Sequence, residues 1–76
     1  MTSDEILAGL RDIRWQALDY AFNRSGQALW RIGPDRERPH VMFQKDVADF
    51  LTGRATLEEI AARNKGADLA FWPVPN

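Results

Sequence analysis

The chain has 76 residues, no cysteine, one histidine and a formal net charge of −1. This length makes one small domain over residues 1–76, and the absence of cysteine excludes both a disulfide framework and a Cys/His zinc site. The core therefore has to come from ordinary apolar packing, for which 45% of the residues are suited.

The N-terminal segment is predicted to form an amphipathic helix. Thr2, followed by Glu5 three residues later, has the pattern of a capping box, in which each side chain bonds the other residue's backbone. Apolar residues then recur at helical spacing, which is typical of a helix with one buried face. These residues are Ile6, Leu7, Leu10, Ile13 and Ala17.

Residues 16–23 fit two different structures. Ala17 and Ala21 continue the apolar stripe at helical spacing, which favours one long helix that ends at Gly26. The same segment also alternates between large apolar residues and smaller or polar ones, and this pattern indicates a strand that turns at residues 24–26. We favour the long helix, and the strand remains the alternative. The alternating apolar set is Leu18, Tyr20 and Phe22.

Residues 27–43 are predicted to form a β-hairpin, with a charged loop that has a proline at each end. A register with Ile32 opposite Val41 gathers five apolar side chains on one face, because side chains alternate along a strand. In this register Trp30 lies opposite Phe43. The five residues are Ala28, Trp30, Ile32, Val41 and Phe43.

Two short helices are predicted after the hairpin. Asp46 is expected to cap the first, and Gly53 is expected to end it in a left-handed conformation. Thr56 and Glu59 form a second capping box, which opens a helix that runs to about Asn64.

The C-terminal segment, residues 68–76, is apolar on both alternating sides. Pro73 and Pro75 cannot donate hydrogen bonds to a neighbouring strand, so this segment forms at most an edge strand or an extended tail. The predicted fold class is therefore α+β: an N-terminal amphipathic helix, a β-hairpin, a short helix pair and a C-terminal edge strand or extended tail.

No group of residues carries a recognisable chemistry. Ser3 and Ser25 are the only serines and His40 is the only imidazole, and the two serines fit a helix start and a turn. The glycines are isolated and do not form a phosphate-binding loop. We therefore expect no enzyme, no cofactor and no bound metal. The N-terminus is acidic and no long apolar run follows it, so we also expect a cytoplasmic protein without membrane contact.

By elimination, we expect a non-enzymatic protein-binding module: a small inhibitor, adaptor or accessory subunit, of the size found among phage and mobile-element regulators. Its partner would be another protein, and a homodimer is a further option. The candidate contact residues are aromatic and charged side chains, since Trp and Arg are frequent interface anchors. They are Trp15, Phe22, Arg31, Asp35, Arg36, Arg38 and Trp72. If the first helix is long, Trp15 and Phe22 share one of its sides, off the main apolar stripe. The alternative role of Trp15 and Trp72 is to cover the two ends of the core.

The alternative is a nucleic-acid-binding regulator that uses the arginine-rich hairpin loop. Residues 24–45 carry five basic and two acidic side chains, a local charge of +3. The negative charge of the whole chain argues against this alternative, because binding to phosphates depends on cations.

Overall fold

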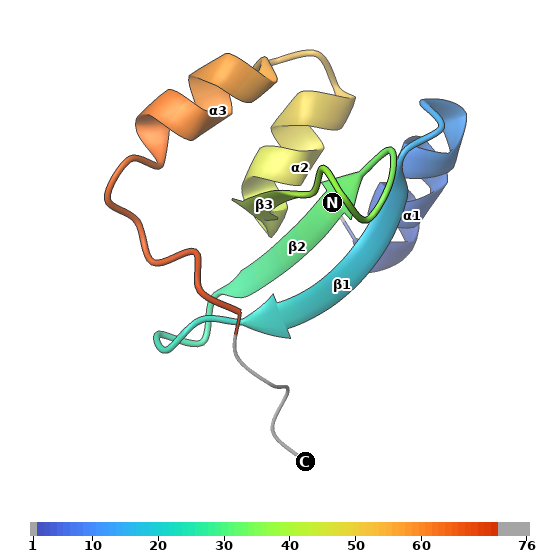
Figure 1. Ribbon diagram of the computed structural model, residues 1–76. Coiled ribbons are helices and arrows are strands. Elements are labelled where there is room, and N and C mark those ends of the chain that lie inside the picture. The colour runs from blue at the N-terminus through green and yellow to red at the C-terminus, as the bar shows by residue number, and fades with distance from the viewer. Residues whose placement is uncertain (1, 72–76) are drawn as a thin grey trace.

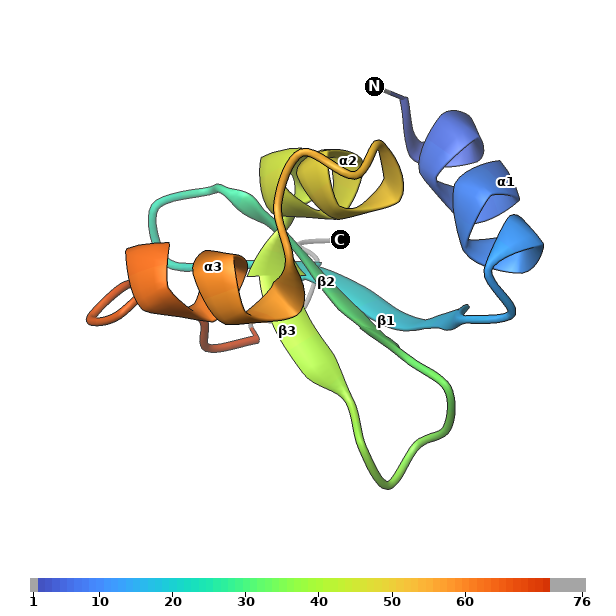
Figure 2. The ribbon, with the colours of Figure 1, turned by 90° about the horizontal axis from the view of Figure 1, so that it is seen from above.

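The computed structural model describes residues 2–71 (Figure 1). Its elements are α1 (Ser3–Asp12), β1 (Gln16–Phe22), β2 (Ala28–Gly33), β3 (His40–Phe43), α2 (Gln44–Leu51) and α3 (Leu57–Arg63). Over the described residues there are thus three helices and one three-stranded antiparallel sheet in the order β1-β2-β3, which confirms the predicted α+β class. Figure 2 shows α2 between α1 and α3.

The start of α1 is the predicted capping box. The Glu5 N–H donates to the Thr2 hydroxyl at 3.2 Å, and the Thr2 N–H donates to the Glu5 carboxylate at 3.4 Å. The helix buries Ile6 and Leu10 and ends after Asp12. It does not continue through residue 23, so the long helix favoured from the sequence is wrong.

Residues 16–22 form β1, so the strand, the alternative interpretation of this segment, is correct. Pairing with β2 brings the Tyr20 ring against Trp30, with centroids 5.1 Å apart and the ring planes tilted by 57°. The turn after β1 is held by the Asn23 carboxamide oxygen, which accepts the N–H groups of Ser25 and Gln27 at 3.0 and 2.9 Å. Tertiary pairing therefore overrides the helical spacing of the two alanines.

The register of β2 and β3 differs by one residue from the predicted one. Ile32 lies opposite His40 and Trp30 lies opposite Met42, so the predicted pairs with Val41 and Phe43 are wrong. Because side chains alternate, this shift turns Val41 and Phe43 to the face away from the helices. Met42 replaces them in the core, where it is 2% exposed.

The helices cover one face of the sheet and enclose the main core. The Trp30 indole, which is 4% exposed, donates its Nε1–H to the Gln44 side chain at 3.3 Å. The core is made entirely of apolar residues from all three helices, from β2 and β3 and from the turn between α2 and α3. Its buried members are Ile6, Leu10, Trp30, Ile32, Met42, Val47, Ala55 and Ile60.

The segment after α3 crosses to the other face of the sheet. The Asn23 carboxamide donates to the Asp68 carbonyl at 3.2 Å, and the Arg31 guanidinium lies 4.6 Å from the centre of the Phe71 ring. Leu29 is fully buried on this face. Residues 68–71 are not a strand, and the remainder of the predicted edge strand or tail lies outside the described residues.

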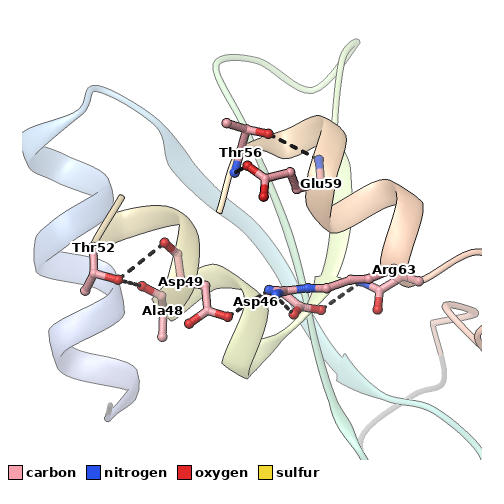
Figure 3. Close-up of polar contacts among 8 residues, drawn as sticks. Asp46, Ala48, Asp49, Thr52, Thr56, Glu59 and Arg63 are labelled. Carbon is pink, nitrogen blue, oxygen red and sulfur yellow. Dashed lines mark hydrogen bonds and ion pairs between the residues drawn. The ribbon is translucent and has the colours of Figure 1, made fainter. Parts of the chain in front are cut away.

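A buried carboxylate joins α3 to α2 (Figure 3). Asp46 is 0% exposed and accepts hydrogen bonds from the Arg63 guanidinium and the Asn64 carboxamide, both at 2.7 Å. Arg63 also donates to Asp49 at 2.8 Å, and chiefly this bond holds the pKa of Arg63 above its ordinary value. Asp46 does not cap α2 as predicted, because the helix begins at Gln44. Its carboxylate instead faces the end of α3.

The capping box of α3 is as predicted. The Glu59 N–H donates to the Thr56 hydroxyl and the Thr56 N–H donates to the Glu59 carboxylate, both at 3.2 Å. Gly53, in the turn before this helix, has a φ of 74°, which is the left-handed conformation expected of it. Within residues 2–71, none of the helices is long and apolar enough to cross a membrane.

Candidate protein-interaction surface

The loop between β2 and β3 has a shape set by its own side chains. The Asp35 carboxylate accepts the N–H groups of Glu37 and Arg38 at 2.9 and 3.0 Å, and it also accepts the Arg38 guanidinium at 3.0 Å. The hydrogen bond from this guanidinium holds the pKa of the Asp35 carboxyl below its ordinary value. At the base of the loop, a Cβ on Gly33 would lie 2.8 Å from the Arg38 carbonyl oxygen, so the chain closes there only around glycine.

An aromatic stack lies at the same end of the sheet. The Trp15 and His40 rings are parallel to within 12°, with centroids 5.3 Å apart, and Trp15 also contacts the Phe50 ring at 5.0 Å. Trp15 directly precedes the pairing of Gln16 with Gly33, where the loop begins. We call the exposed and half-buried side chains at this end the loop-end surface: Trp15, Arg36, Arg38 and His40.

Trp15 is both a core cover and a surface residue. Its side chain is half-buried and packs against the main core, while its stacking partner His40 is exposed. We therefore expect Trp15→Ala to lower the free energy of unfolding as well as the affinity for a partner. The two loop arginines do not contribute to the core, because Arg36 is exposed and the Arg38 side chain is 75% exposed.

The other predicted contact residues do not join this surface. Phe22 lies at the far end of β1, where its ring meets Tyr20 edge-on, so it does not share a helix side with Trp15. Arg31 lies on the face away from the helices, paired with Asp19 at 2.8 Å. Trp72 lies outside the described residues.

The turn between α1 and β1 holds a residue in an unusual conformation. Arg14 has a φ of 62°, and the N–H groups of Arg14 and Trp15 donate to the carbonyls of Arg11 and Leu10 at 3.2 and 2.9 Å. This is the bonding of a Schellman motif, in which glycine usually occupies the left-handed position. The sequence carries no glycine at this point, so reasoning from residue types missed this turn.

Arg14→Gly is expected to raise the free energy of unfolding by about 0.5–1 kcal/mol. A non-glycine residue in this conformation costs about 1–2 kcal/mol, and the larger entropy that glycine loses on folding offsets part of the gain. Urea unfolding measures the change. The matched control is Arg11→Gly in the last turn of α1, which should lower stability by about 1 kcal/mol. A loss of stability in Arg14→Gly would contradict the idea that the turn is strained.

Comparisons with known proteins give no relative. No protein-family model matches the chain, and no curated protein sequence or solved structure matches it. Among residues 2–71, no three acidic, histidine or cysteine side chains gather in a group that could hold a metal ion.

Proposed function

We propose that the protein is a non-enzymatic protein-binding module that contacts its partner through the loop-end surface, as a cytoplasmic inhibitor, adaptor or accessory subunit. The stack of Trp15 on His40, next to a loop shaped by Asp35, carries this proposal. Tryptophan and arginine are the side chains that most often anchor protein interfaces. A loop already held in one conformation loses little entropy when it binds.

Arg14 supports the same surface. It directly precedes Trp15 and keeps a long charged side chain at a position whose conformation favours glycine. Strain of this kind is commonly retained where the side chain is used.

The nucleic-acid alternative has less support. Arg31 of the basic stretch lies on the face of the sheet away from the helices, and its ion pair with Asp19 at 2.8 Å reduces the charge that is available to a phosphate backbone.

The double variant Arg36→Ala/Arg38→Ala is expected to weaken partner binding by about 30-fold or more, the equivalent of roughly 2 kcal/mol for the loss of interface anchors. Exposed substitutions of this kind change stability by less than about 0.5 kcal/mol. Affinity capture from cells that naturally make the protein, with mass spectrometry, identifies the partner, and titration with the purified partner measures the affinity.

The matched control is Arg24→Ala/Lys65→Ala, which removes the same charge from the turn between β1 and β2 and from the segment after α3. We expect this control to bind as the unaltered protein does. Equal binding by both double variants would contradict the assignment of the loop-end surface. Capture of nucleic acid, with an affinity that falls steeply with salt, would favour the alternative function.

A further inference from the structure

The outer edge of β1 has no strand partner within residues 2–71, because the strand order is β1-β2-β3. Its sequence, Gln-Ala-Leu-Asp-Tyr-Ala-Phe, contains none of the lysine or proline residues that usually protect a sheet edge from pairing. The one charge, Asp19, is neutralised by Arg31 at 2.8 Å. This edge is therefore nearly neutral, and its one irregularity is the register shift between Ala17 and Asp19, at the N-terminal end of the strand.

An apolar groove runs beside this edge, between α1 and β1. It has a volume of about 480 Å³, and Leu7, Leu18 and Trp30 are among the residues that line it. Tyr20 also lines the groove and is 42% exposed, which with Ile13 makes it one of the two most exposed large apolar residues between positions 2 and 71. The patch therefore continues from the core to the free edge.

We propose that the β1 strand of a second copy of this chain pairs antiparallel with this edge, with a two-fold axis at Tyr20. In that register Tyr20 lies opposite its own counterpart, and Leu18 lies opposite the partner's Phe22. Apolar residues directly opposite one another stabilise a strand pair. A two-fold interface requires a surface that complements itself. The apolar residues are spaced equally on both sides of Tyr20, so this edge meets that requirement.

Charge favours the same register. Asp19 then lies opposite the partner's Ala21, and each carboxylate keeps its own Arg31. A two-fold axis at Asp19 would instead set the two carboxylates directly opposite one another, which is destabilising. The symmetric placement of apolar residues on both sides of Tyr20 is the reason to commit to a second copy rather than to an unrelated strand.

The groove adjoins the segment that would pair, since Leu18 and Tyr20 both line it. A standard interface buries about 800 Å² per partner, which is roughly 15% of the 5254 Å² surface of this chain. Leu18 has no partner in β2, because the register shifts between Ala17 and Asp19, and we take the segment shared with the second copy to begin at this residue and to end at Phe22. The partner's Phe22, opposite Leu18, would then lie at the groove and add its ring to the buried surface.

The absence of cysteine from the sequence allows a direct test. Strand partners lie about 4.5–5.5 Å apart between Cα atoms, which is within the range of a disulfide. Under mild oxidation, Tyr20→Cys is expected to form a disulfide-linked dimer. The control Ala61→Cys, at an exposed position on α3, should remain monomeric on a non-reducing gel. Light scattering of the unaltered protein should give twice the chain mass of 8.7 kDa.

A mass of 8.7 kDa throughout the micromolar range would overturn the proposal. A dimer that Tyr20→Cys does not crosslink would also overturn it, because the interface would lie elsewhere. Since Tyr20→Cys removes a ring from the patch, half-labelled unaltered protein supplies a second measurement by NMR. Contacts between Leu18 and the partner's Phe22 should appear, and their absence from a dimer would contradict the register. The arginine variants of the loop-end surface test the proposed function independently of these outcomes.

Discussion

Trp30→Ala is expected to lower the free energy of unfolding by about 3–5 kcal/mol, the usual cost of removing a large aromatic side chain from a core. The indole is 4% exposed and lies between Met42 of β3 and Tyr20 of β1. Its hydrogen bond to Gln44 is lost as well. Domains of 76 residues have a stability of roughly 4–11 kcal/mol, so the variant should be close to unfolding at room temperature.

Thermal and urea unfolding measure this change, and Trp15→Ala is the matched control. It removes the same side chain from a position that is only half-buried, at the loop end of the sheet. We expect the control to lose clearly less stability than Trp30→Ala. An equal or larger loss from Trp15→Ala would mean that the centre of the core lies nearer the loop end than the structure places it.

Asp46→Ala is expected to lower the free energy of unfolding by about 2–4 kcal/mol, because two hydrogen bonds to a fully buried carboxylate disappear. Both bonds come from residues at the end of α3. The loss should therefore loosen α3 more than the remainder of the fold. In this variant, amide hydrogen exchange should become faster in residues 57–63 by a larger factor than in α1.

Asp49→Ala is the control for this variant. Its carboxylate bonds the same guanidinium at 2.8 Å, but its side chain keeps 30% of its exposure. An ion pair that is partly solvated is worth about 1 kcal/mol or less. If Asp46→Ala and Asp49→Ala lower the free energy of unfolding equally, the burial of Asp46 would not explain the stability that its contact with α3 contributes.

Much of the fold follows from local patterns in the sequence. The capping boxes at Thr2 and Thr56 and the left-handed Gly53 depend on residues within one helical turn of each other. The α+β class follows from the amphipathic helix and the hairpin with its charged loop. These features are local, so the sequence alone was sufficient to find them.

The sequence indicated some of the residues that form the loop-end surface. The sequence pointed to Trp15 and to the loop with Arg36 and Arg38, and the structure brings these to one end of the sheet. It did not indicate that His40 would stack on Trp15, since that contact joins residues 25 positions apart. Whether this surface binds a partner stays a prediction.

Three features were decided only by tertiary structure. Residues 16–22 have the spacing of either a helix or a strand, and pairing with β2 selects the strand. The β2–β3 register could place either Met42 or Val41 in the core, because both are apolar, and packing of the sheet against the helices selects Met42. Asp46 has the appearance of a helix cap, and its burial arises only when Arg63 and Asn64 approach from α3. In each case the local energies of the alternatives are similar, so contacts between residues distant in sequence determine which one forms.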